Sequence, residues 1–204
     1  MLQDSARRLA TDFPSLSVYA VVGSFGEHLD RVPRHGKRLV VFLGSTVGNF
    51  DDEELTEFLA SVRLLLQPGD SFLIGIDLLK DEGELLAAYN DAQGVTAQFN
   101  LNVLRVVNRE LDADFDLEGF EHVALFNRER SRIEIYLRSR RGQSVSIPGA
   151  DLVVHFEPGE LLRTEISVKF TRESIERELC DSGLRPIRWY SDDAKRFALS
   201  LSSP

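Results

Sequence analysis

The sequence predicts an α/β fold built on an open sheet with crossover helices. Two segments, Leu39–Gly44 and Ser71–Ile76, are continuous apolar runs, which is typical of strands buried on both faces of a parallel sheet. A helical pattern separates them, and the order strand, helix, strand indicates a crossover unit. Ligands of such sheets bind outside the carboxyl ends of the strands, so these ends are the first places to look for a site.

Length, composition and charge exclude several classes of protein. The chain has 204 residues, of which 43% are hydrophobic and 28% charged, which excludes disordered and low-complexity classes. The formal net charge is -9 and no segment is a basic block, so we expect no nucleic-acid partner. Uncharged runs such as Leu39–Phe50 are too short to span a bilayer, and the first residues do not form a signal peptide. We therefore expect a cytoplasmic protein without a membrane partner, monomeric by default.

Local patterns give the elements that precede residue 79. Apolar side chains recur at helical spacing after Asp51 and Asp52, until Pro68-Gly69 ends the helix. The β-rich run Leu16–Gly23 ends at a glycine and predicts a further strand. The elements expected here are, in order, the tail of a helix over residues 4–10, strands over 16–23 and 39–44, a helix from 52 to 67, and a strand over 71–76 that ends at Asp77.

The pattern then changes to that of an α+β unit. Two helices are expected near residues 82–88 and 96–110, and four short strands follow. In the first of these strands Ile133 and Ile135 alternate with Glu134 and Tyr136, which favours an antiparallel sheet with one solvated face. After Thr171 the chain returns to the helix and strand pattern seen before residue 79, with a helix over 172–182 and strands over 185–190 and 197–202. We expect residues 79–169 to be a subdomain inserted into a domain formed by 1–78 and 170–204.

The segment Gly44–Phe50 is the first candidate site, because it is small and polar and follows a buried strand. Glycines allow a ligand to approach the backbone closely, and Asn49 offers both a donor and an acceptor. A plain strand-to-helix turn needs the same residue types, so that alternative stays open. The ending Gly-Lys-Ser/Thr of a phosphate-binding P-loop is absent.

The segment Thr164–Val168 is the second candidate. Residues two apart in a strand share a face and lie about 6.6 Å apart, so Glu165 and Ser167 point the same way. A carboxylate beside a hydroxyl can hold a small ring that bears an N–H, such as an imidazole. The alternative is an ordinary solvated sheet face.

Other polar residues are weaker candidates. The segment Tyr89-Asn90-Asp91 is either part of a binding site or an ordinary helix C-cap with surface residues. Asp77 is either a site residue or an N-cap or loop carboxylate. Cys180 follows Leu179 in a helix, so we expect a small buried apolar residue. We expect no metal site, because the four histidines show no ligand spacing, and no nucleophile elbow is present. The histidines are His28, His35, His122 and His155.

Five stretches together match one known family, in the family's own order. They are Phe42–Phe50, Gly75–Asp81, Ala88–Asp91, Gly94–Asn100 and Thr164–Phe170. With them the chain resembles, from about Ser17 to Leu201, the histidine-specific methyltransferases that use S-adenosylmethionine and make the trimethylated histidine of ergothioneine synthesis. The resemblance implies a class I, Rossmann-like methyltransferase sheet, and it makes residues 79–169 the substrate-binding insertion.

The resemblance also assigns roles to particular side chains. It implies that Asn49 and Tyr89 hold the carboxylate and amino end of histidine, and that Glu165 and Ser167 hold the imidazole. Gly44 is expected near the methionine part of the cofactor. The turn that carries Asn49 and the strand that carries Glu165 should then converge on one cavity sized for a single amino acid.

Two departures from the family qualify these expectations. The family's domain continues upstream, so we expect a sheet that is incomplete at its N-terminus, without the glycine-rich loop and the ribose-binding acid. Where relatives place Asp-Phe against adenine, this chain has Ser24-Phe25; Phe25 can still stack, but the carboxylate is lost. A methyl transfer to the α-amine needs no covalent enzyme intermediate, and no residue is an evident general base. The alternative hypothesis is a non-catalytic remnant that binds a small amino acid or a partner; a truncated reading frame, whose missing part is encoded just upstream, is a further alternative.

Overall fold

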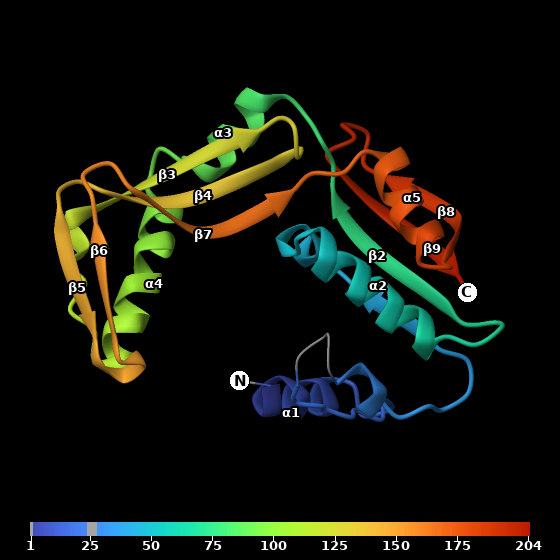
Figure 1. The fold of residues 1–204 in the computed structure, drawn as a ribbon. Helices are drawn as coiled ribbons and strands as arrows, with labels where there is room; N and C mark the ends of the chain where they lie inside the picture. The colour runs from blue at the N-terminus through green and yellow to red at the C-terminus, as the bar shows by residue number, and fades with distance from the viewer. Residues whose placement is uncertain (1, 24–27) are drawn as a thin grey trace.

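The computed structural model describes residues 2–23 and 28–204 and contains three sheets (Figure 1). The first sheet has four strands in the order β1-β2-β9-β8. Its first two strands are parallel and the other pairs are antiparallel. These strands are β1 (Leu39–Phe42), β2 (Ser71–Asp77), β8 (Arg185–Ser191) and β9 (Phe197–Ser203).

Two helices pack on this sheet and form its core. Helix α2 (Asp52–Leu65) connects β1 to β2, and helix α5 (Arg172–Asp181) precedes β8, as the apolar periodicity predicts. Capping boxes at Asp51 and Thr171 begin the two helices, because each side chain accepts a hydrogen bond from a backbone N–H of the first turn. The largest fully buried side chains of this core are Leu59, Phe72, Ile74, Ile76, Ile175, Leu179 and Leu184.

The middle of the chain forms the other two sheets, on the far side of β2 from α5 in Figure 1. Helices α3 and α4 pack against the three-stranded sheet β3-β4-β7, and a β-hairpin of β5 and β6 extends from it. The helices are α3 (Glu82–Tyr89) and α4 (Val95–Leu111). The strands are β3 (Phe120–Asn127), β4 (Arg132–Ser139), β5 (Gln143–Ile147), β6 (Leu152–Phe156) and β7 (Leu161–Val168).

Strand β7 leads straight from the three-stranded sheet back to the four-stranded one. Phe170 donates its backbone N–H to the carbonyl of Asp77 at 3.1 Å, and Leu79 donates to the carbonyl of Phe170 at 2.9 Å. A parallel bridge between Leu78 and Phe170 completes this junction. The chain therefore leaves the first sheet and returns to it at one place, the carboxyl end of β2.

The predicted strand Leu16–Gly23 is wrong. Residues 17–22 have no strand hydrogen bonding, and the N-terminal helix α1 (Leu2–Asp12) is longer than the predicted 4–10. A β-strand requires backbone hydrogen bonds to a neighbouring strand, and no described strand lies beside this segment. Four short 3₁₀ helices complete the described structure: η1 (Leu29–Arg31), η2 (Thr46–Asn49), η3 (Leu117–Gly119) and η4 (Pro148–Ala150).

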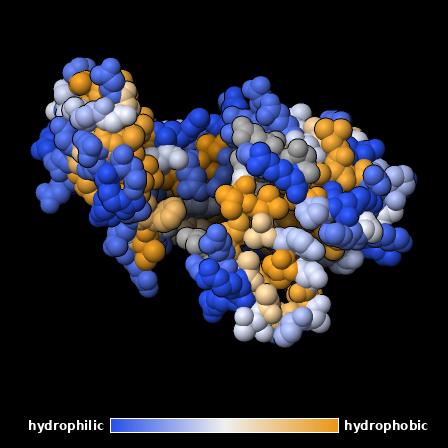
Figure 2. Space-filling model, turned by 90° about the horizontal axis from the view of Figure 1, so that it is seen from below, coloured by the Kyte–Doolittle hydropathy of each residue, from blue (hydrophilic) through white to orange (hydrophobic). Residues whose placement is uncertain are grey.

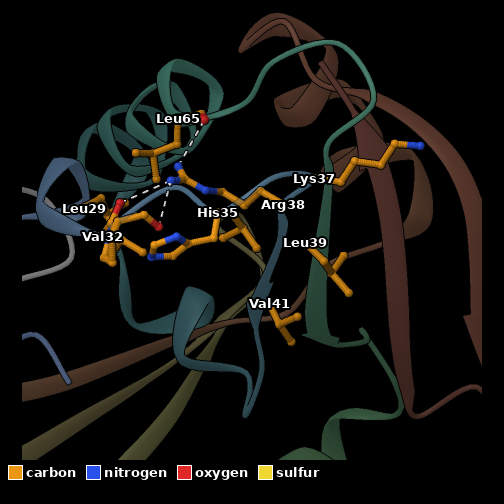
Figure 3. A pocket seen from close by; sticks show the side chains of 10 residues that line it. Leu29, Val32, His35, Lys37, Arg38, Leu39, Val41 and Leu65 are labelled. Carbon is orange, nitrogen blue, oxygen red and sulfur yellow. Dashed lines mark hydrogen bonds between the residues drawn. The ribbon is translucent and has the colours of Figure 1, made fainter. Parts of the chain in front are cut away.

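Strand β1 is not buried on both faces, contrary to the prediction. Phe42 faces the core, whereas Leu39 and Val41 are 56% and 47% exposed, because nothing among the described residues covers that face. The labelled side chains of Leu39 and Val41 lie beside a pocket of about 430 Å³ in Figure 3. Arg38 also lines this pocket, and it donates to the carbonyls of two other lining residues, Val32 and Leu65, at 3.2 Å each. Apolar side chains also gather in several places on the face shown in Figure 2.

The prediction that Cys180 is buried is also wrong, since the thiol residue is exposed. Ile175 and Leu179 point into the core, and the next residue is turned by about 100° around the helix axis. Helical phase, rather than residue type, decides the position of this side chain.

Helix η2 reaches the free edge of β7, and a glycine makes the contact possible. A Cβ atom built on Gly48 would lie 2.8 Å from the carbonyl oxygen of Val168, which is closer than real Cβ atoms approach other heavy atoms. The φ angle of Gly48 is negative, so space alone requires glycine here. This contact brings the residues after β1 against β7.

We expect Gly48→Ala to lower the free energy of unfolding by about 1–3 kcal/mol, because the methyl group forces η2 and β7 apart. Urea denaturation followed by circular dichroism measures the change. Gly142→Ala is the matched control: its φ is also negative, and its added Cβ would meet nothing closer than 3.8 Å. It should shift the value by less than about 1 kcal/mol. Equal effects of the two substitutions would contradict the steric argument.

Candidate functional site

Asn49 and Glu165 meet across the contact between η2 and β7. The amide nitrogen Nδ2 of Asn49 donates to Oε1 of Glu165 at 3.3 Å. Asn49 is exposed and Glu165 is half-buried, so both remain accessible to a ligand. The glycine-containing turn after β1 and the Glu/Ser strand therefore converge, as the sequence predicts, while the size of the space between them stays a prediction.

Tyr89 and Ser167 form a second contact next to the first. The phenolic hydroxyl of Tyr89, at the end of α3, donates to Oγ of Ser167 at 2.9 Å. Ser167 lies opposite Ile133 in the β4–β7 ladder, and Glu165 lies opposite Ile135. Because opposite residues of an antiparallel pair share a face, the two polar side chains stand beside an apolar strip that α3 covers. The structure thus brings all four residues of the predicted substrate site together.

The position of Tyr89 is fixed by a hydrogen-bond chain behind it. Nε2 of His122 lies 2.9 Å from the carbonyl oxygen of Tyr89, and Nδ1 lies 3.0 Å from Nδ2 of Asn100. A carbonyl can only accept, so Nε2 carries the proton and Nδ1 accepts from Asn100. Asn100 is buried in α4 and also donates to the carbonyl of Tyr136 at 2.9 Å. His122 therefore has a structural role, linking α3 and α4 to the sheet.

Lys169 is the residue of this site that sequence reasoning missed. Its side chain is 1% exposed, and Nζ donates to Oδ2 of Asp77 at 2.7 Å, to the Tyr89 hydroxyl at 2.8 Å and to Ser167 Oγ at 2.7 Å. Nζ also lies 4.9 Å from the centroid of the Tyr89 ring. The period-two pattern that pairs Glu165 with Ser167 continues to Lys169, so that pattern could have found it.

Asp77 serves as an anchor for two lysines. Its Oδ1 accepts from Lys80 at 2.7 Å while Oδ2 accepts from Lys169. Burial opposes ionisation of the Asp77 carboxyl, but the hydrogen bonds and charges of Lys169 and Lys80 outweigh it, so its pKa lies below the usual range. The carboxylate is therefore ionised near neutral pH and fully engaged, which favours a structural role over a direct one.

Asp91 acts as a cap, which is the ordinary alternative for this segment. Its carboxylate accepts from the backbone N–H groups of Thr96 and Val95 at 2.8 Å each, at the start of α4. The hydrogen bonds from Thr96 and Val95 lower the pKa of Asp91 to about 2. Asn90 is the C-cap of α3. Of the three residues Tyr89, Asn90 and Asp91, the structure brings Tyr89 alone to the Glu165 and Ser167 pair.

The expected cofactor residues are described in part. Gly44 follows β1 with a φ of 85°, and an added Cβ would meet nothing closer than 3.8 Å. Bare backbone beside open space at the carboxyl end of a strand fits the approach of a cofactor. Ser24 and Phe25 lie outside the described residues.

Within residues 2–23 and 28–204, no His, Cys, Asp and Glu side chains gather in threes as a metal site requires. The same residues contain no helix that is long and apolar enough to cross a membrane. What the site offers is an acceptor at Glu165, hydroxyls at Ser167 and Tyr89, and an amide at Asn49. These groups can bind and orient a small polar molecule that carries a ring.

Comparisons with known proteins identify relatives of this chain. The chain is 50% identical to a histidine N-alpha-methyltransferase of Mycolicibacterium smegmatis over 202 residues, and 46% identical to that of Mycobacterium tuberculosis over 203 residues. These alignments cover 99% and 100% of this chain but 63% of each relative, so the chain spans less than two thirds of their length.

A solved structure supports the fold. An S-adenosylmethionine-dependent methyltransferase from Clostridium acetobutylicum superposes with a TM-score of 0.50 at 12% identity, covering 99% of this chain and 70% of the other. At this identity the match shows a shared fold and no more. The family described as histidine-specific, SAM-dependent methyltransferases matches residues 1–204. The chain therefore belongs to the histidine-specific, S-adenosylmethionine-dependent methyltransferases.

Proposed function

We propose that this chain takes part in S-adenosylmethionine-dependent methylation of the α-amino group of L-histidine, with trimethylhistidine as the product. The observation that carries the proposal is the meeting of Asn49, Tyr89, Glu165 and Ser167 from three separate elements. The family to which the chain belongs is described as histidine-specific, which supports the same substrate.

In this proposal the imidazole is held by the two polar side chains of β7, Glu165 and Ser167. The Glu165 carboxylate accepts the ring N–H, and the Ser167 hydroxyl bonds the other ring nitrogen. Ile133 and Ile135 lie opposite these residues on the same face, where they are buried under α3 and support the polar pair from beside it. We propose residues 79–169 as the substrate-binding insertion, because three of the four polar groups come from it.

Asn49 and Tyr89 would orient the other end of the amino acid. The Asn49 amide exchanges its 3.3 Å contact with Glu165 for the carboxylate of histidine, which releases Glu165 for the ring. The Tyr89 hydroxyl donates to Ser167 and accepts from Lys169, so its remaining lone pair can accept an N–H of the α-amine. Holding both ends aims the lone pair of the amine, and such positioning is worth about 7–11 kcal/mol in favourable cases.

The cofactor supplies the electrophilic methyl group when it is bound. Of the residues that we propose for its site, Gly44 leaves room for its methionine part, while Ser24 and Phe25 stay predictions for the adenine. The chain itself would supply orientation and exclusion of water. We assign no general base, since the amine can react in its neutral form.

Titration calorimetry of the purified chain tests the proposed function. We expect one L-histidine per chain and a separate heat for S-adenosylmethionine, with each ligand tightening the binding of the other. Histidine binding without any response to S-adenosylmethionine would instead favour a non-catalytic amino-acid binder. Binding of neither ligand would contradict the proposal.

We expect Glu165→Ala to weaken histidine binding by about 2–5 kcal/mol, because the ring N–H loses its charged acceptor. Glu165→Gln keeps an acceptor oxygen and should lose less. Calorimetry at pH 7.5 measures both values. Glu57→Ala, at an exposed position on α2, is the control and should bind like the wild type. Unchanged affinity in Glu165→Ala would remove this residue from the site.

A further inference from the structure

The buried side chain of Lys169 has no assigned role in the proposed reaction, and its contacts point to one. A lysine ammonium group has three N–H donors and no acceptor. All three donors are used, on Asp77 Oδ2, the Tyr89 hydroxyl and Ser167 Oγ, at 2.7–2.8 Å. With 2% of the residue exposed, none of these bonds competes with bulk water. Lys169 therefore restricts which way the two hydroxyls can point.

The proton of Tyr89 is directed to Ser167. Both hydroxyl oxygens accept from Lys169, and they lie 2.9 Å apart, so one of them donates to the other. A phenol is a stronger hydrogen-bond donor than an alcohol, so Tyr89 donates and Ser167 accepts. Both lone pairs of Ser167 Oγ are then occupied, by Tyr89 and by Lys169.

The proton of Ser167 is consequently left for a ligand. In the described part of the chain, Ser167 Oγ donates no hydrogen bond. Glu165, two residues away on the same face, is an acceptor when ionised. The two side chains together present one acceptor and one donor. A neutral imidazole has the complementary pair, one N–H and one bare nitrogen, whereas an imidazolium has two N–H groups.

We propose that Lys169 is a positioning residue that makes Ser167 an obligate donor, so that the Glu165 and Ser167 pair binds the neutral imidazole ring and rejects the imidazolium. This inference rests on the proposed function for the identity of the ligand. Among the described residues, five charged or titratable groups surround Ser167. Asp77 ends β2 and Lys80 follows it, and Tyr89 ends α3. Glu165 lies on β7, and Lys169 directly follows that strand. Strand β4 contributes Ile133, and η2 contributes the neutral Asn49.

The pH dependence of histidine binding tests this role. Free imidazole side chains titrate near pH 6.5, so about ten elevenths of the rings are neutral at pH 7.5 and about one eleventh at pH 5.5. If the neutral ring alone binds, the apparent Kd of the wild type rises about tenfold between these two pH values. In Lys169→Met, Ser167 regains a free lone pair and can accept from the imidazolium, so the rise should fall below about threefold.

Two further variants separate positioning from other effects. Lys80→Met removes the other lysine on Asp77 but touches neither hydroxyl, so it should keep the tenfold rise. Tyr89→Phe frees one lone pair of Ser167 without burying a new group, so it should flatten the pH profile, and it serves if Lys169→Met does not fold. If the apparent Kd still rises tenfold between pH 7.5 and pH 5.5 in both Tyr89→Phe and Lys169→Met, the proposal is overturned. It is also overturned if Lys80→Met reduces this rise as much as Lys169→Met does, because the effect would then come from net charge alone.

A measurement without ligand keeps this inference distinct from the proposed function. In proton NMR of the free wild-type chain, we expect a slowly exchanging Tyr89 hydroxyl proton with a cross-peak to the Ser167 Cβ protons, absent in Lys169→Met. Rapid exchange in both proteins overturns the role of Lys169. A wild type that binds no histidine at pH 7.5 overturns the proposed function and the imidazole selection that depends on it, while the hydroxyl spectrum still decides whether Lys169 orders Ser167.

Discussion

One desolvated ammonium group, that of Lys169, joins the parts of this molecule that form the site. A buried charge is tolerated when it is paired and fully hydrogen-bonded, and Lys169 meets this condition with acceptors from three elements. Asp77 comes from the end of β2, Tyr89 from the end of α3 and Ser167 from β7. Because each acceptor must stay near 2.7 Å from the nitrogen, the ends of these elements are held together.

The same strand, β7, supplies both the junction and the proposed specificity. One of its edges pairs with β4, and its other edge receives η2 through the close approach at Gly48. One face carries Glu165 and Ser167 in sequence, and the lysine follows two residues later. A displacement of β7 would therefore disturb the substrate contacts and the connection between the sheets at the same time. In this fold, specificity and architecture are properties of one segment.

The local sequence pattern was sufficient for most strands and helices, and for the shared face of Glu165 and Ser167. These features depend on periodicity and capping, which are properties of a few neighbouring residues. The failures have a different origin. The run Leu16–Gly23 has β propensity but no neighbouring strand among the described residues, and Cys180 has an apolar character but the wrong helical phase. Lys169 was overlooked because its importance comes from Asp77 and Tyr89, which are distant in the sequence.

The open side of β1 affects how this chain behaves in the test tube. Leu39 and Val41 lie on one face of β1, an edge strand whose outer backbone groups have no strand beside them in the described structure. Such an exposed sheet edge is a template with which a strand of a second molecule can pair. Preparations will therefore tend to precipitate as they are concentrated. Dilute and cold storage, which weakens apolar association, is the appropriate condition for keeping them clear.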